Sequence, residues 1–267
     1  MWTHPMEYAW RTDRGRVREH NEDAVAVQAD LGLVVVADGV GGASAGEVAS
    51  QLAADTIRAC FQRQLLPWTD AEQARRVVEA AVQEANRAVW QLSQSKPDCD
   101  GMGTTLVLGF AGADWLAYVN VGDSRLYRLR GERLEQLSHD HSFIQAVVDQ
   151  GLFRSLDDAR RHGIGEHILT RALGIAAQLR ATCRLTDLRG GDLYLFCTDG
   201  LTGMVPEDAL CQRLRAVGTS PLESAAEALL RLANARGGTD NITLVLMRVG
   251  ASLADDGPDT CAPAIPG

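Results

Sequence analysis

Short apolar runs alternate along the chain with clusters of turn-forming residues. Runs of this length that are rich in valine, leucine and isoleucine are typical of strands. We expect strands at residues 24–29, 31–37, 104–110, 115–121, 125–129, 133–137, 179–185, 192–197 and 242–249. Short turns separate the runs between 104 and 137, which favours antiparallel pairing. The arginines of the predicted 125–137 hairpin are expected on its solvent face.

Apolar positions recur at helical spacing over two stretches between residues 44 and 92, which predicts two long helices. Three Ser/Thr-x-x-Glu patterns have the form of a capping box, a signal that begins many helices. These pairs are Ser44 with Glu47, Thr69 with Glu72, and Ser220 with Glu223. Another helix is expected to open at Pro206, and Pro221 suits the first helical position after Ser220.

The order of these elements predicts the fold class, because strands and helices do not alternate strictly. We predict an α+β fold, a four-layer α-β-β-α sandwich of two antiparallel sheets flanked by helices. One domain is expected over residues 1–249, with a polar insert at about 139–173 that leaves the core. Residues 250–267 are rich in Pro, Gly and Asp without periodicity, which predicts a disordered tail.

The net charge and the cysteine pattern limit the kinds of partner that the protein can bind and the compartment in which we expect it. The net charge of −9 argues against sequence-independent binding to nucleic acid or to an anionic membrane. No apolar run is long enough for a transmembrane helix, and the first residues lack the apolar core of a signal peptide. The six cysteines include no Cys-x-x-Cys pair, so we expect neither a zinc site nor disulfides, and the cytoplasm is the simplest compartment. We also expect a monomer. Because Lys96 is the only lysine and follows no glycine, a phosphate is expected to meet arginine.

Acidic residues stand at the ends of several predicted strands, next to small residues. Asp38 and Asp199 end apolar runs and precede glycine, Asp123 follows a glycine, and Asp240 precedes the last strand. One Asp-Gly pair alone indicates a turn. Several carboxylates at one edge of a sandwich would repel each other unless cations lay between them. Oxygen ligands favour Mg²⁺ or Mn²⁺ over zinc.

Seven motifs, in this order, resemble the metal-dependent protein phosphatases of the PP2C type (the PPM family), and most closely their short bacterial branch. They are Arg18-x-x-Asn21-Glu22-Asp23, Asp38-Gly39-Val40-Gly41-Gly42, Gly101-Met102-Gly103-Thr104-Thr105, Gly122-Asp123-Ser124-Arg125, Asp140-His141-Ser142, Asp199-Gly200 and Asp240-Asn241. The resemblance extends from about Gly15 to Val249.

The resemblance implies a set of ligands for two Mn²⁺ or Mg²⁺ ions per chain. Asp38 would bridge the two ions, and the carbonyl of Gly39 would bind the second ion. Asp199 and Asp240 would complete the protein ligands of the first ion. Asp123, together with Asp199, would hold a third and weaker ion. Residues 139–173 would correspond to the flap beside the active site.

The resemblance also assigns roles around these ions. Glu22, Asp23 and Asn241 would lie in a second layer, where the two acids orient metal-bound water. Arg18 would be the catalytic residue that grips the substrate phosphate in a bidentate fork. Val40 stands where many eukaryotic members have a histidine that acts as general acid. Water is therefore the expected proton donor, ahead of a histidine of the insert.

The implied function is hydrolysis of phosphoserine and phosphothreonine in proteins, by direct attack of a hydroxide that bridges the two ions. The implied partners are phosphorylated proteins and a bacterial Ser/Thr kinase that the enzyme opposes, and type VI secretion is one setting for such a pair. Two alternatives remain open at this point. One is a non-catalytic binding module of the same family. The other is a dinucleotide-binding oxidoreductase, because 33–44 imitates a glycine-rich strand-turn-helix motif.

Overall fold

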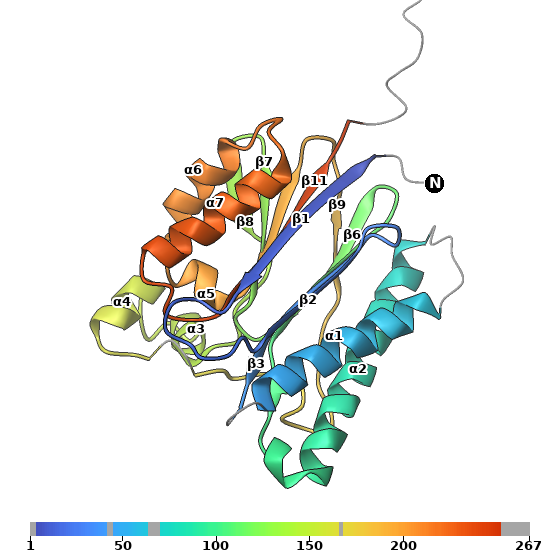
Figure 1. The fold of residues 1–267 in the computed structure, drawn as a ribbon, viewed down its shortest axis with the longest axis vertical. Coiled ribbons are helices and arrows are strands. Elements are labelled where there is room, and N and C mark those ends of the chain that lie inside the picture. The colour runs from blue at the N-terminus through green and yellow to red at the C-terminus, as the bar shows by residue number, and fades with distance from the viewer. Residues whose placement is uncertain (1–3, 42–44, 64–69, 166–167, 252–267) are drawn as a thin grey trace, which may run out of the picture.

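Two antiparallel sheets form the centre of the structure, a computed structural model that describes residues 4–41, 45–63, 70–165 and 168–251 (Figure 1). Sheet A has the strand order β1-β11-β10-β7-β8, and sheet B has the order β2-β3-β5-β6-β9 with β4 paired to β3. The strands are β1 (Met6–Asp13), β2 (Asp23–Gln28), β3 (Leu33–Val40), β4 (Gly103–Thr104), β5 (Leu106–Ala111), β6 (Trp115–Val121), β7 (Arg125–Arg130), β8 (Arg133–Gln136), β9 (Arg184–Asp187), β10 (Leu193–Cys197) and β11 (Ile242–Val249). All pairings between these strands are antiparallel, which excludes the dinucleotide-binding alternative with its parallel sheet.

Helices cover the outer face of each sheet, so the predicted four-layer sandwich is confirmed. Sheet B is covered by α1 (Ala45–Gln62) and α2 (Ala71–Ser95), and sheet A by α6 (Glu207–Arg215) and α7 (Leu222–Ala235) (Figure 1). Buried side chains of both sheets meet in the middle layer, among them Val34, Val36, Leu126, Tyr194 and Phe196. None of the helices in the described ranges is both long and apolar enough to cross a membrane.

The polar segment that follows β8 forms a small unit at one end of the sandwich. It contains α3 (Phe143–Asp149) and α4 (Leu156–Arg161), which stand near the short helix α5 (Asp199–Thr202) in Figure 1. Ile144, Val147 and Ala159 form an apolar cluster within this unit. A further short helix, η1 (Pro97–Cys99), follows α2.

The starts of two helices differ from the predicted capping boxes. Asp70 is the N-cap of α2 and accepts a hydrogen bond from the Glu72 N–H, one residue after the predicted Thr69. The α7 helix begins at Leu222, with Pro221 as a cap that makes no side-chain bond, so Ser220 does not have the predicted role. Pro206 precedes α6 as predicted. Ser44 and Thr69 lie outside the described residues.

Two strand predictions were wrong. β1 was not predicted, because its edge position leaves polar and apolar residues mixed along both faces. The predicted strand 179–185 is instead an irregular segment that reaches β9 only at its end. Side chains of α2 hold this segment: Gln83 donates to the Leu179 carbonyl, and Asn86 Nδ2 donates to the Ala176 carbonyl at 3.0 Å. The part of the predicted tail from 252 to 267 lies outside the described residues.

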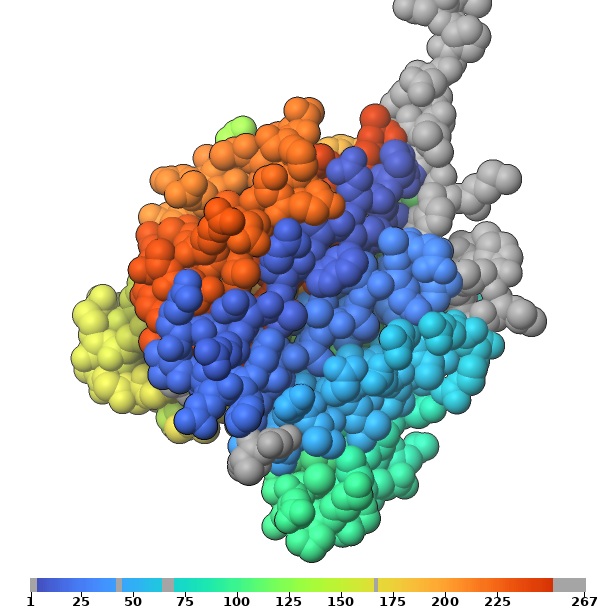
Figure 2. All heavy atoms as spheres, viewed as in Figure 1, coloured from blue at the N-terminus to red at the C-terminus, as the bar shows by residue number. Residues whose placement is uncertain are grey.

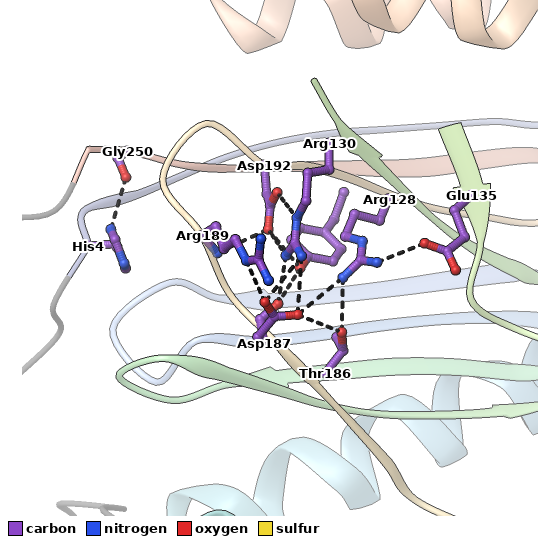
Figure 3. Close-up of polar contacts among 10 residues, drawn as sticks. His4, Arg128, Arg130, Glu135, Thr186, Asp187, Arg189, Asp192 and Gly250 are labelled. Atoms are coloured by element: carbon purple, nitrogen blue, oxygen red, sulfur yellow. Dashed lines mark hydrogen bonds and ion pairs between the residues drawn. The ribbon is translucent and has the colours of Figure 1, made fainter. Parts of the chain in front are cut away.

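Arginines of β7 join the two sheets near the first residues of β10 (Figure 3). Arg130 binds Asp192 through Nε and Nη2, each at 2.7 Å, and reaches Asp187 on β9 at 3.1 Å. Arg128 donates to Glu135 on β8 at 2.7 Å. The side chain of Arg128 is only 13% exposed, so the prediction of a solvent face was wrong for it. Both arginines also reach the neighbouring sheet, where Asp187 on β9 forms an ion pair with each of them.

Candidate metal centre

Five aspartates are brought to the opposite end of the sandwich by the order of the strands. Asp38 lies near the end of β3, and Asp23 faces it across the β2–β3 pair. Asp199 begins α5 directly after β10, and Asp240 stands just before β11. Because β10 and β11 are antiparallel neighbours, the end of one meets the start of the other. Asp123 lies in the turn from β6 to β7.

These carboxylates lie close enough together to influence each other's ionisation. Burial, and then the charges of Asp23, Asp199, Asp123 and Asp240, raise the pKa of Asp38 well above its usual range. Burial raises the pKa of Asp23 to about 7, with further contributions from Asp199 and Asp240. The pKa of Asp123 is raised to about 7 by burial and by the charges of Asp199 and Asp140. A site that concentrates negative charge in this way favours a multivalent cation.

The acids do not yet form a closed cluster. In the described ranges, no group of three or more His, Cys, Asp or Glu side chains is arranged so that it could hold a metal ion. Both oxygens of Asp240 are engaged within the chain: Oδ2 accepts from Arg18 at 2.8 Å and Oδ1 accepts from the Asn241 N–H at 2.8 Å. Oδ1 of Asp23 is buried and has no hydrogen-bond partner within the described chain. The oxygen-only donor set fits Mg²⁺ or Mn²⁺, provided that Asp240 turns away from Arg18.

Close backbone contacts fix the end of β3 against the start of α1. A Cβ atom at Gly39 would lie 2.0 Å from the Gly46 carbonyl oxygen, so only glycine fits there. The Gly39 N–H donates to the Glu22 carbonyl at 3.1 Å, and the Ser50 hydroxyl donates to the same carbonyl. Gly39 and Glu22 are therefore held side by side next to Asp38.

Asn241 organises the loop that carries Arg18. Its buried side chain donates to the carbonyls of Arg14 at 3.0 Å and His20 at 2.8 Å, and its Oδ1 accepts from the Glu22 N–H at 2.8 Å. The three bonds tie both ends of the loop between β1 and β2 to the start of β11. Asn241 thus links the position of Arg18 to that of Asp240.

Comparisons with known proteins show to which family the chain belongs. The model of the family described as protein phosphatase 2C matches residues 12–241. The chain belongs to the protein phosphatase 2C family. It is therefore a hydrolase, and its substrates are phosphoproteins.

Several relatives resemble this phosphatase over most of their length. The serine/threonine phosphatase Stp of Listeria monocytogenes is 37% identical over 245 residues, which cover 91% of this chain and 95% of the relative. The catalytic domain of the serine/threonine protein phosphatase PstP, solved with two manganese ions, is 35% identical with a TM-score of 0.81, covering 93% of this chain and 100% of that domain. PppA, a key regulatory component of the type VI secretion system in Pseudomonas aeruginosa, is 32% identical with a TM-score of 0.79, covering 91% and 97%.

The phosphatase also holds the root of its insert next to the acids. Arg125, at the start of β7, binds both oxygens of the buried Asp140 through Nε and reaches Oδ2 through Nη2 at 2.6 Å. Gln136 donates to the same carboxylate at 2.9 Å. A cavity of about 90 Å³ opens between these groups and the residues Asp199 and Asp240. The Arg125–Asp140 pair was not identified from the sequence, although both residues belong to motifs noted there.

Hydroxyl groups behind the acids were also missed by the sequence analysis. Thr105 Oγ1 accepts from the Asp38 N–H at 2.9 Å and lies 2.6 Å from the Ser124 hydroxyl. Thr198 donates to Asp23 Oδ2 at 3.0 Å. Thr105 interrupts the predicted strand 104–110, which the structure divides into β4 and β5. The sequence signal that could have drawn attention to Thr105 is its place in the Gly101-Met102-Gly103-Thr104-Thr105 motif.

Proposed function

We propose that the phosphatase hydrolyses phosphoserine and phosphothreonine with the help of two divalent cations, Mn²⁺ or Mg²⁺. The observation that carries the proposal is the convergence of five aspartates from the ends of five different strands. Asp38, the Gly39 carbonyl, Asp199 and Asp240 would hold the two ions, and Asp123 with Asp199 would hold a third. The manganese ions of PstP and the names of the Listeria and mycobacterial relatives support this choice.

The chain's own residues bind and orient the substrate. Arg18 is the candidate phosphate ligand, because its side chain is half exposed and already reaches an oxyanion, the carboxylate of Asp240. A phosphate would take the place of that carboxylate. When bound, a pair of divalent ions supplies a water nucleophile at neutral pH and offsets charge on the phosphoryl oxygens. Glu22 and Asp23 would accept hydrogen bonds from the attacking water and fix its direction.

Solvent is the proposed proton donor to the leaving group. Val40 has no proton to give, and the two histidines at the root of the insert are engaged elsewhere. Nε2 of His139 lies 2.7 Å from Asp149, and Nδ1 of His141 accepts from the Gly122 N–H at 3.2 Å. Burial lowers the pKa of His141 to about 4, so it is neutral at pH 7. These contacts support water over a histidine.

The proposed setting is a bacterial cytoplasm, in which a monomeric phosphatase opposes a Ser/Thr kinase. The five cysteines that the structure describes are free thiols, which suits a reducing compartment. Similarity to PppA supports type VI secretion as one pathway for such a pair.

The decisive experiment measures phosphate release from a phosphothreonine peptide in Mn²⁺, in Mg²⁺ and in EDTA. We expect Mn²⁺ to stimulate the wild type and EDTA to abolish its activity. Asp38→Ala should lose at least ~100-fold in kcat, because a central ligand is removed. Asp114→Ala, in the exposed β5–β6 turn, is the matched control and should keep full activity. Activity that survives both EDTA and Asp38→Ala would disprove the two-ion mechanism, and an inert wild type would favour the non-catalytic binding module.

A further inference from the structure

Four exposed arginines lie on the two loops that meet at Asp240. Arg14, Arg16 and Arg18 lie on the loop between β1 and β2, and Arg236 lies on the loop between α7 and β11. We call this set the arginine rim. Figure 2 shows the dark blue atoms of the N-terminal region, to which the first loop belongs, on the surface beside the orange-red atoms of the C-terminal helices.

The two loops of the rim are fastened to each other. The Arg16 N–H donates to the Gly238 carbonyl at 2.7 Å. A Cβ atom at Gly15 would lie 2.2 Å from the Asp240 carbonyl oxygen, so the backbones of the two loops are in direct contact. Gly15 also has a positive φ of 78°. The bonds of Asn241 hold the same loop from the other side. The rim is therefore a preorganised surface, which lowers the entropic cost of binding.

Most of the positive charge on the rim is available to a ligand. Arg18 pairs with Asp240, but no ion pair joins Arg14, Arg16 or Arg236 to an acid in the part of the chain that the structure describes. Glu19 is the exposed acid of the same loop and offsets one of these charges.

Neighbouring charges do not extend the rim along β1. Asp13 uses its Oδ1 to accept from the Gly15 N–H and from Asn234. Arg11 is paired with Glu227 and is not part of the rim. The whole chain has a net charge of −9, so this positive surface stands out against its background.

We infer that the arginine rim selects phosphoproteins in which acidic residues flank the phosphorylated serine or threonine. This inference rests on the proposed function, because Arg18 would hold the phosphate itself. A peptide whose phosphate reaches Arg18 would lie next to the loop that also carries Arg14 and Arg16. Carboxylates on that peptide would meet Arg14, Arg16 and Arg236, whereas an acidic protein surface would repel them elsewhere.

The test compares two phosphothreonine peptides of equal length, one with Asp and Glu around the phosphothreonine and one with Asn and Gln at the same positions. The wild type should show a kcat/KM about 10-fold higher for the acidic peptide at low salt, as expected for a few exposed ion pairs. The preference should shrink as the ionic strength rises, because salt screens exposed charges.

Variants localise the preference to the rim. A triple variant with Arg14→Gln, Arg16→Gln and Arg236→Gln should bring the ratio of the two kcat/KM values close to 1. Arg213→Gln removes an exposed arginine of α6 and should keep the wild-type ratio. Equal kcat/KM values for both peptides in the wild type would overturn the inference, as would a preference that survives in the triple variant.

A third substrate separates this inference from the proposed function. p-Nitrophenyl phosphate has no flanking residues, so its hydrolysis by the wild type with Mn²⁺ reports on the aspartate site alone. Hydrolysis of this compound without discrimination between the peptides overturns the rim and leaves the proposed function standing. Failure to hydrolyse all three substrates overturns both.

Discussion

At the scale of single residues, two buried asparagine side chains fix the backbone of loops by hydrogen bonds. Asn241 and Asn86 are both almost completely buried, and each forms three hydrogen bonds to the backbone of a loop. Asn241 holds the loop of Arg18, whereas Asn86 holds the segment that leads from the insert to β9. The two residues therefore form a natural pair for comparison.

Replacing Asn241 with Ala should impair both stability and catalysis. Each buried backbone group that loses its partner costs about 1–3 kcal/mol, so the free energy of unfolding should fall by ~2 kcal/mol or more. The loop would also release Arg18, and kcat/KM for a phosphopeptide should fall about 10- to 100-fold. Urea denaturation and steady-state kinetics measure the two effects.

Asn86→Ala is the control for this prediction. It should cost a similar free energy of unfolding while kcat/KM stays within about twofold of the wild type, because its hydrogen bonds reach Gly174, Ala176 and Ala177 and none of the aspartates. Equal loss of kcat/KM in both variants would show that Asn241 acts only through general stability.

At the scale of elements, the insert is attached to the sandwich by polar contacts at its first residues. Arg125 binds Asp140, and His141 Nδ1 accepts from the Gly122 N–H. The neutral imidazole is required for that bond, since a protonated Nδ1 cannot accept. The root of the insert is thus sensitive to pH in a range where most carboxylates are already ionised.

The pKa of His141 predicts how stability changes with pH. Its pKa is lowered to about 4, chiefly by burial and then by the charge of Arg171, whereas the unfolded chain has a pKa near 6.5. Between these values the unfolded state binds more protons, so stability from this group is complete above pH 6.5 and is lost as the pH falls towards 4. The slope should remain below ~1.4 kcal/mol per pH unit, because the ring is partly exposed.

Urea denaturation at pH 5 and pH 7.5 checks this prediction. His141→Gln keeps a hydrogen-bond acceptor but cannot titrate, so it should lose less free energy of unfolding than the wild type between the two pH values. An identical pH dependence in both proteins would contradict the proposed role of the imidazole.

At the scale of the whole molecule, the two ends of the sandwich differ in how their charged side chains are paired. One end gathers aspartates whose repulsion costs stability, and the other end joins the sheets through paired arginines and acids (Figure 3). Asp192 is the centre of the second end: its side chain is 1% exposed and binds Arg130, the Arg189 N–H and the Tyr194 hydroxyl. Stability and catalysis should therefore be separable by mutation.

Asp192→Asn should destabilise the fold without changing the chemistry. Loss of the buried charge leaves Arg130 without its main partner, and we expect the free energy of unfolding to fall by about 2–4 kcal/mol. The kcat should stay unchanged at a temperature where the variant is folded, since Asp192 lies at the opposite end of β10 from Asp199. Arg189→Gln changes an exposed side chain, so its free energy of unfolding should stay within about 0.5 kcal/mol of the wild-type value. A large drop in kcat for Asp192→Asn would show that the two ends are coupled.

The sequence by itself determined the family and the layers, and it indicated the acids that we propose as metal ligands. Alternating apolar runs are local signals, and strands such as 115–121 and 242–249 were predicted with the limits that the structure shows. The aspartates were found because each one stands at the end of such a run. The conformations of the edge strand β1 and of the irregular segment before β9 were not predicted. The pairing of β1 with β11 decides the first, and the polar side chains of α2 decide the second.

Only the tertiary structure decided which polar groups meet. Arg125 with Asp140, Asn241 with the Arg18 loop, and Arg130 with Asp192 join residues that are 15 to 227 positions apart or belong to separate strands. No local pattern encodes such pairs, because the energy of each depends on burial and on the geometry of two elements at once. The same holds for the repulsion among the aspartates, which exists only after antiparallel pairing has brought the strand ends together.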